Sequence, residues 1–202
     1  HDALPISIMI SGFGVWEIGL VLLLVFFFFG AKRIPVIGRG ENRISFIYAT
    51  DLAEGDGNGA RDVFVHDRDT GETTRVSVDS GGNEGDGDSS GPSISADGHY
   101  VAFHSYATHL VAGDGNDAYD IFVHDRESGQ TERVSVDSDG NEGNYSSVDP
   151  SISADGRYVV FKSDATNLVP GDTNGERDSF VAANPLSEPS TTAATVTITD
   201  DD

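Results

Sequence analysis

Hydrophobic residues are distributed unevenly along the chain, and the first concentration lies near its start. Between residues 8 and 31 the only charged side chain is Glu17, and residues 18–29 carry no polar side chain. Four successive phenylalanines leave no polar face, which disfavours the alternative of a buried helix in a soluble domain. Together with residues 13–16, the run is long enough for a thin bilayer. We therefore predict one hydrophobic, transmembrane-like α-helix, with residues 8–31 in contact with the membrane.

After residue 43 the pattern changes to short apolar runs separated by clusters of Gly, Asp, Asn and Ser. The runs are rich in β-branched and aromatic residues, and turn signals such as Ala-Asp-Gly and Glu-Ser-Gly separate them, as is typical of β-strands. The apolar central runs indicate a sheet buried on both faces. In the best-defined unit the predicted strands are residues 92–95, 100–105, 121–124 and 131–136.

These units repeat along the chain with a fixed period. RDVFVHDRDTGETTRVSVDSGGNEG at residues 61–85 recurs as YDIFVHDRESGQTERVSVDSDGNEG at residues 119–143, a spacing of 58. A period of this size indicates a repeat architecture, which a β-sandwich would not explain. Residues 43–181 hold about 2.4 periods, whereas closed β-propellers typically have 4–8 blades. We therefore predict an all-β fold, a partial β-propeller of about 2.4 four-stranded blades, preceded by the hydrophobic α-helix.

The repeat motifs resemble a known family. PSISADGRYVVFKS at residues 150–163, together with the recurring DVFVHDRxTGxTxRVSV, resembles the TolB-like family of β-propeller repeats over about residues 43–182. The resemblance implies a secreted or periplasmic bacterial module. Because the predicted propeller is incomplete, its edges would be open and further blades are expected as partners.

A second resemblance covers about residues 9–40. An apolar run followed by Phe-Gly-x-Lys-Arg-x-Pro resembles the TatA family of twin-arginine translocase subunits, in which a short transmembrane helix meets an amphipathic helix at a hinge. The helix and hinge residues that match are Glu17, Phe29, Gly30, Lys32, Arg33 and Pro35. The amphipathic helix expected after Gly40 is replaced here by the β repeats, which is the main departure from the family.

The last residues resemble a third family. TVTITDDD at residues 195–202 resembles the closing strand of a Calx-beta domain, which implies a part in calcium binding. The predicted organisation is therefore a segment derived from a sequencing adaptor at residues 1–7, a TatA-like helix and hinge at 8–42, TolB-like repeats at 43–182, and a linker with a Calx-beta-like strand at 183–202.

The charges near the predicted hinge raise a question of topology. Lys32, Arg33, Arg39 and Arg43 follow the hydrophobic run and would hold its C-terminal side in the cytoplasm. The TolB-like repeats, in contrast, are expected in the periplasm or outside the cell. The sequence therefore predicts a chimeric or fragmentary chain, joined near residues 40–42.

The charge of the repeat region limits its partners. The whole chain has a net charge of −22, and the residues after 43 contain 8 basic and 31 acidic side chains. Such a surface repels nucleic acid and attracts cations, so we predict no nucleic-acid partner. The chain contains no cysteine, which excludes disulfides and thiolate chemistry.

Three loops share the pattern Asp-x-Asn-x-x-x-Asp, one in each repeat. Oxygen ligands at alternate positions near glycine suit Ca²⁺, although the glutamate at the twelfth position of an EF-hand is not in register. The alternative is that Asp and Asn form turns at the strand entry. Both interpretations stay open, with Ca²⁺ as the candidate cofactor. The predicted metal ligands are Asp56, Asn58, Asp62, Asp114, Asn116, Asp120, Asp172, Asn174 and Asp178.

Two of the histidines follow the repeat, and common catalytic motifs are absent from the sequence. His66 and His124 recur in the VHDR motif, so we expect a structural hydrogen bond to Asp67 or Asp125. The sequence contains no Gly-x-Ser-x-Gly, no His-Glu-x-x-His and no phosphate-binding glycine loop, and we name no catalytic residue.

These observations predict a non-enzymatic binding module. It would present its loops to a protein or carbohydrate partner at the bacterial cell envelope, with Ca²⁺ as a stabilising ion. The alternative is a TatA-like subunit of the twin-arginine protein translocase. A propeller that accompanies a hydrolase domain has no supporting residues in this sequence.

Overall fold

The computed structural model describes residues 44–49, 57–187 and 197–198, which all belong to the unit Pro35–Asp202. The predicted helix and hinge, including Glu17, Phe29, Gly30, Lys32, Arg33 and Pro35, lie outside these residues. Within the described part of the chain, no helix has the length and apolar character needed to cross a membrane.

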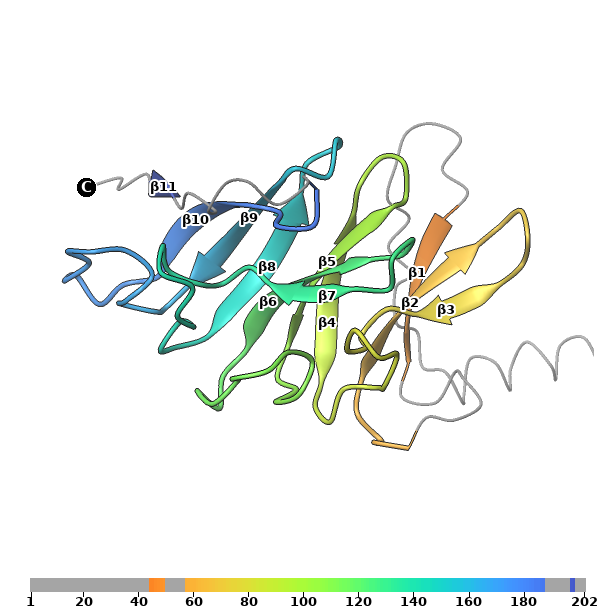
Figure 1. Ribbon diagram of the computed structural model, residues 1–202, viewed down its shortest axis with the longest axis horizontal. Helices are drawn as coiled ribbons and strands as arrows, with labels where there is room; N and C mark the ends of the chain where they lie inside the picture. Colours follow the sequence, from red (N-terminus) through yellow and green to blue (C-terminus); the bar gives the residue numbers. More distant parts are fainter. Residues whose placement is uncertain (1–43, 50–56, 188–196, 199–202) are drawn as a thin grey trace, which may run out of the picture. The chain divides into compact units, whose positions relative to one another are not determined.

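The described residues form eleven β-strands in three antiparallel sheets (Figure 1). The first sheet has the order β1-β2-β3, the second β4-β5-β6-β7 and the third β11-β10-β9-β8. The strands are β1 (Ile44–Ala49), β2 (Asp62–Asp67), β3 (Thr73–Arg75), β4 (Ser89–Ile94), β5 (Tyr100–Ser105), β6 (Asp120–Asp125), β7 (Thr131–Arg133), β8 (Ser147–Ile152), β9 (Tyr158–Ser163), β10 (Asp178–Ala183) and β11 (Thr197–Ile198).

Local sequence explains the hairpin between β6 and β7. The carboxylate of Asp125 accepts hydrogen bonds from the backbone N–H groups of Glu127 and Ser128, at 2.8 and 3.2 Å. Gly129 then adopts a φ of 75°, in the left-handed region that glycine enters without steric cost. Asp67 and Gly71 repeat this arrangement between β2 and β3, which fixes the register of both hairpins.

The predicted fourth strand of the second repeat is shorter than expected. Residues 131–136 were expected to be one strand, but β7 ends at Arg133. The ladder ends because the side chain of Ser135 takes over from the backbone, accepting a hydrogen bond of 3.0 Å from Ile121 N–H. Val136 then forms an isolated bridge with Glu142.

The core is divided between the two faces of the second sheet. On one face Val101 and Phe103 pack with Val63 and Val65 of the first sheet, and all four are at most 1% exposed. On the other face Ala102, Ile121 and Val123 join a cluster with residues of the third sheet. The prediction of a sheet buried on both faces is therefore confirmed.

Polar contacts also join the sheets. Ala96 N–H donates to the carbonyl of Ala154 at 2.9 Å, which links the Asp-Gly turns of the second and third sheets. Thr131 donates its hydroxyl to the carbonyl of Val78 at 2.6 Å, which links the second sheet to the first. Repeated four-stranded antiparallel sheets that pack face to face are the arrangement of neighbouring propeller blades, so the predicted all-β fold class is confirmed.

The third sheet differs from the second on its outer face. Tyr158 and Val160 of β9 are 48% and 45% exposed, whereas Ala102, at the position of Val160 one repeat earlier, is completely buried. Alternation along β9 places these side chains on the face opposite Val159 and Phe161. The described residues therefore leave this face open.

Candidate functional site

The predicted metal loop of the second repeat folds as a turn before β6. Asn116 accepts a hydrogen bond of 2.8 Å from Ala118 N–H and donates one of 2.7 Å to the carbonyl of Gly143. The first of these bonds is an Asx turn, the alternative that the sequence left open. After this turn, Asp120 begins β6 and is completely buried.

The Asp120 carboxylate is surrounded by donors. Its Oδ1 accepts a hydrogen bond of 2.6 Å from the Ser135 hydroxyl, and its Oδ2 accepts one of 3.0 Å from the Asn116 amide. The Arg133 guanidinium lies 3.4 Å from Oδ2. Burial nevertheless raises the pKa of Asp120 to about 6, because Ser135, Arg133 and Asn116 offset only part of the desolvation.

Glu142 completes this group, which we call the acidic cluster and define as Asp114, Asp120 and Glu142. One carboxylate oxygen from each residue lies within 4.8 Å of the others. Glu142 also pairs with Arg133 and accepts a hydrogen bond of 3.2 Å from Gly115 N–H. Burial raises the pKa of Asp114, against the opposing charge of Arg133.

The first repeat contains the same arrangement. Asp62 accepts a hydrogen bond of 2.6 Å from the Ser77 hydroxyl and lies 3.5 Å from the Arg75 guanidinium. Arg75 also pairs with Glu84, and this bond is the first cause of the lowered pKa of Glu84. Asn58 forms the Asx turn to Ala60 N–H at 2.6 Å. Asp56, the first predicted ligand of this loop, lies outside the described residues.

The third loop keeps only part of the arrangement. Asn174 accepts a hydrogen bond of 2.9 Å from Glu176 N–H, so its Asx turn is present. Asp172 and Asp178 are half-buried rather than completely buried. The positions one period after Arg133 and Glu142 are Thr191 and Asp200, which lie outside the described residues.

The structure thus adds residues that the loop pattern did not include. Arg75 and Arg133, Glu84 and Glu142, and Ser77 and Ser135 all recur with the period of 58 in the TxRVSVDSxGNEG motif, which was the available signal. Carboxylate oxygens could hold a hard cation such as Ca²⁺ at the acidic cluster. The arginine already supplies positive charge there, so a bound cation would have to displace it from Asp120 and Glu142.

The predicted partner of His124 is wrong, because its Nδ1 bonds to the hydroxyl of Thr131 at 2.9 Å rather than to Asp125. His66 Nδ1 makes the equivalent bond of 2.9 Å with the Thr73 hydroxyl. The cause is the hairpin register, which places His124 opposite Thr131 on the adjacent strand. Burial lowers the pKa of His124, which suits a neutral, structural histidine.

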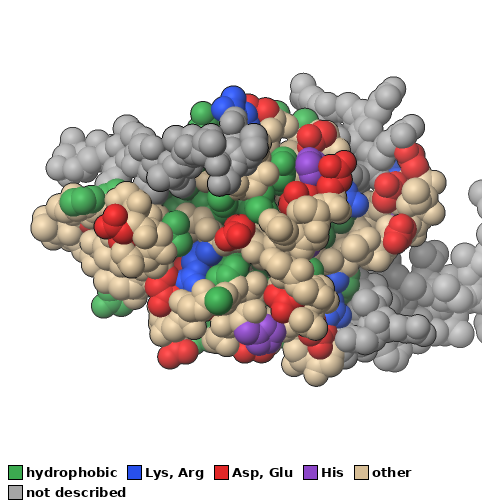
Figure 2. Space-filling model, in the orientation of Figure 1, with side chains coloured by type: hydrophobic (Ala, Val, Ile, Leu, Met, Phe, Trp, Pro, Cys, Tyr) green, Lys and Arg blue, Asp and Glu red, His purple; other side chains and the backbone are tan. Residues whose placement is uncertain are grey.

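Acidic side chains are common on the surface around these elements, and Figure 2 shows Asp and Glu at many places on one face.

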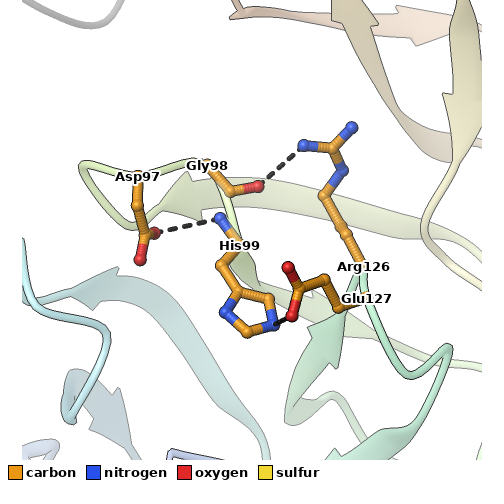
Figure 3. Close-up of a pocket in the computed structure, with 5 residues that line it drawn as sticks. All are labelled: Asp97, Gly98, His99, Arg126 and Glu127. Carbon is orange, nitrogen blue, oxygen red and sulfur yellow. Dashed lines mark hydrogen bonds and ion pairs between the residues drawn. The ribbon is translucent and has the colours of Figure 1, made fainter.

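A separate cavity of about 350 Å³ lies beside the β4–β5 and β6–β7 turns, lined by Asp97, Gly98, His99, Arg126 and Glu127 (Figure 3). His99 Nε2 lies 2.7 Å from Asp125 and 3.5 Å from Glu127. Arg126 donates to the carbonyl of Gly98 at 2.7 Å, which fixes its guanidinium at the rim.

Comparison with known protein families gives one match, near the start of the chain. The model of the mttA/Hcf106 family, TatA_B_E, matches residues 11–41, so the predicted TatA-like segment is confirmed at that level. No curated protein matches the chain.

Two solved structures are similar to the chain. One is a protein assigned as TolB from Agrobacterium tumefaciens, with 22% identity, a TM-score of 0.42, and coverage of 71% of this chain and 41% of that chain. The other is the acylaminoacyl peptidase of Pyrococcus horikoshii, with 13% identity, a TM-score of 0.39, and coverage of 77% and 23%. The chain therefore spans less than half the length of either structure.

Proposed function

We propose that residues 43–182 are a non-enzymatic module of β-propeller repeats that binds a protein or carbohydrate partner at the bacterial cell envelope. The observation that carries the proposal is a difference in exposure between the residues that recur in the repeats and the residues that do not. Polar residues that recur in the repeats, such as Asp120 and Ser135, are buried and bonded to one another. Residues that break the repeat, such as Tyr106 and Tyr145, are 44% and 57% exposed and are available to a partner.

The proposal excludes catalysis by the acidic cluster. A general acid or base must reach a substrate proton within hydrogen-bond distance. Asp120, whose pKa of about 6 would suit that role, has no exposed surface and already contacts Ser135, Asn116 and Arg133. Its raised pKa follows from burial within the fold and needs no catalytic explanation.

Membrane attachment belongs to the same proposal. The family match at residues 11–41 supports contact with the membrane through residues 8–31. The repeats would then be held close to the membrane, in the periplasm or outside the cell. Their net negative charge disfavours nucleic acid as a partner.

We also include further blades among the partners. Within the chain, β8 covers the face of the second sheet that carries Ala102, and Ile152 N–H donates to the Ser93 hydroxyl at 3.0 Å across that junction. The corresponding face of the third sheet exposes Tyr158 and Val160. A further repeat would bury this face in the same way.

Calcium is proposed as a stabilising ion rather than as a reactant. The acidic cluster would provide Asp114, Asp120 and Glu142 as oxygen ligands, with Asn116 nearby. Metal binding would relieve the repulsion among three carboxylates while freeing Arg133. The Calx-beta-like end at residues 199–202 lies outside the described residues and remains a prediction.

A TatA-like translocase subunit is the second candidate function. The family match at residues 11–41 favours it, because that segment holds the hydrophobic run and the hinge. It would transport proteins rather than bind a ligand through the repeats. Expression of the full chain in a strain without its own TatA should restore twin-arginine export if this candidate is correct.

The binding function is tested directly with the full chain in detergent. Biolayer interferometry against purified envelope proteins and defined oligosaccharides should give saturable binding to members of one class. Ester and peptide substrates should be hydrolysed no faster than by a heat-unfolded sample. Hydrolysis above that background, or the absence of binding to either class, would contradict the proposal.

A further inference from the structure

One pair of equivalent positions carries charged side chains in the third repeat and aromatic side chains in the second. In the third repeat Arg177 and Asp164 form a two-point ion pair, with both N–O distances at 2.7 Å. One period earlier the same positions are Tyr119 and Tyr106. Their rings lie 5.4 Å apart at an angle of 62°, so an aromatic pair replaces the ion pair.

A third tyrosine belongs to the same end of the second and third sheets. Tyr145 is 57% exposed and takes the position of Gly87 one repeat earlier. It precedes Ser146 and Ser147, which bond to the backbone N–H and carbonyl of Tyr119 at 3.3 and 2.6 Å. We call Tyr106, Tyr119 and Tyr145 the tyrosine patch.

Tyr119 of the patch is held in place by neighbouring side chains. The imidazole of His104 meets the Tyr119 ring edge to face, with centroids 5.4 Å apart at 83°. His104 Nε2 is in turn bonded to the Ser90 hydroxyl at 2.8 Å. A ring held in this way loses little conformational freedom when a ligand binds, which favours recognition. In the next repeat His104 is replaced by Lys162, so this support is specific to the second repeat.

The surrounding charge indicates which ligand would suit the patch. Residues 57–187 contain 24 acidic and 8 basic side chains. Five of the basic side chains pair with carboxylates of this same region: Arg61, Arg75, Arg133, Lys162 and Arg177. The excess carboxylates create a negative potential that attracts cations to the surface.

Tyrosine faces in such a field attract cationic side chains. An ammonium or guanidinium over a tyrosine ring gains a cation–π interaction, and the planar guanidinium also stacks. One cationic side chain of the chain already lies beside Tyr119, since Arg61 pairs with Asp88 at 2.7 Å next to it. The carboxylate of Asp88, and to a lesser extent the hydroxyl of Tyr119, raises the pKa of Arg61.

We propose that the tyrosine patch binds a basic segment of a partner protein, with an arginine or lysine side chain over a tyrosine ring. This inference rests on the proposed binding function and names the class of partner and the surface. Neutral oligosaccharides, which also stack on tyrosine, are the competing class of ligand. Their binding to the patch would overturn the inference but leave the binding function intact.

The test uses the full chain in detergent and a fluorescein-labelled hepta-arginine peptide, with anisotropy as the readout. The double variant Tyr106→Ala/Tyr145→Ala should bind the peptide about 5- to 10-fold more weakly than the wild type, as expected for the loss of two exposed cation–π contacts. Tyr158→Ala is the matched control, because Tyr158 is 48% exposed on the third sheet. It should keep the wild-type affinity.

The outcomes separate the two levels of the account. Equal peptide affinity in all three proteins would overturn the tyrosine patch as the basic-segment site. Loss of oligosaccharide binding, without loss of peptide binding, in the double variant would assign the patch to carbohydrate instead. If the wild type binds neither the peptide nor any oligosaccharide or envelope protein, the proposed binding function fails as well.

Discussion

Ser135 donates its hydroxyl hydrogen to the Asp120 carboxylate at 2.6 Å, and Ser77 makes the same bond to Asp62 one repeat earlier. Each serine also accepts a hydrogen bond from the backbone N–H that follows its aspartate, at 3.0 Å from Ile121 and 3.1 Å from Val63. The serine therefore closes the sheet where the backbone ladder stops. These polar groups are buried and stabilise each sheet from within, so they are not exposed to a protein or carbohydrate partner.

Replacing Ser135 with alanine should destabilise the chain. The change leaves the Asp120 carboxylate and the Ile121 N–H without their serine partner in a buried place, which costs about 1–3 kcal/mol. Urea unfolding, followed by circular dichroism, should show a lower midpoint urea concentration for the variant than for the wild type. Ser138→Ala, at an exposed serine of the following loop, should leave the midpoint unchanged. An equal effect of both variants would contradict this account of Ser135.

The pKa of Asp120 predicts a specific dependence of stability on pH. Because its pKa is about 6 in the folded chain and 3.8 in the reference state, the folded state holds the proton more tightly. The contribution of Asp120 to the free energy of unfolding is therefore greatest below pH 4 and is lost as the pH rises to 6. Other carboxylates, such as Asp125, have lowered pKa values and act in the opposite direction at lower pH.

Asp120→Asn isolates this effect. The difference in unfolding free energy between the wild type and the variant should decrease steadily from pH 4 to pH 6, and then level off. Urea unfolding at four or five pH values measures it. A difference that stays constant over this interval would show that Asp120 is ionised in the folded chain as readily as in the unfolded chain.

Much of this fold could be predicted from the period of 58. It located the strands and the Asp-Gly turns, because the same apolar runs and glycines recur in each unit. The first strand shows where the period fails. Ile44 pairs with Asp67 as Tyr100 pairs with Asp125, although 56 residues and not 58 separate Ile44 from Tyr100. The strand pairing is unchanged, and the difference lies in the connection, which is two residues shorter between β1 and β2 (residues 50–61) than between β5 and β6 (residues 106–119).

The candidate site was less predictable. The Asn116 turn follows from local sequence, but its bond to Gly143 joins residues 27 positions apart. The meeting of Arg133 and Glu142 with Asp120 depends on how the loop after β7 folds back over the start of β6. Such contacts between distant segments leave no local signal, and only their recurrence in the first repeat, at Arg75 and Glu84, points to them.

Gly156→Ala should weaken the contact between the second and third sheets. Gly156 has a φ of 73°, and an added Cβ would lie 2.5 Å from the Tyr100 ring. Gly129→Ala is the matched control, since Gly129 has a similar φ of 75° but open space at its Cβ position. Both changes cost about 1–2 kcal/mol for the left-handed backbone, and only Gly156→Ala adds the clash. Equal losses in urea unfolding would argue against close packing at Tyr100.

Calcium should raise the thermal unfolding midpoint if the acidic cluster binds it. Ligand that binds only the folded state stabilises it by RT ln(1 + [L]/Kd), about 2.7 kcal/mol at 100 times Kd. Scanning calorimetry with calcium and with a chelator measures the shift. Glu142→Gln should abolish the shift, while Glu132→Gln, at an exposed side chain of β7, should preserve it. A shift that is identical in both variants would place calcium elsewhere.

Hydrogen–deuterium exchange of the full chain, with and without the hepta-arginine peptide, would locate the surface that the peptide contacts. If the module recognises its partner through the tyrosine patch, the peptide should slow exchange in residues 104–119 and 144–147 and leave β10 unchanged. Slower exchange confined to the cavity around His99 and Arg126, or to the loop of Asp172 and Asn174, would contradict the account.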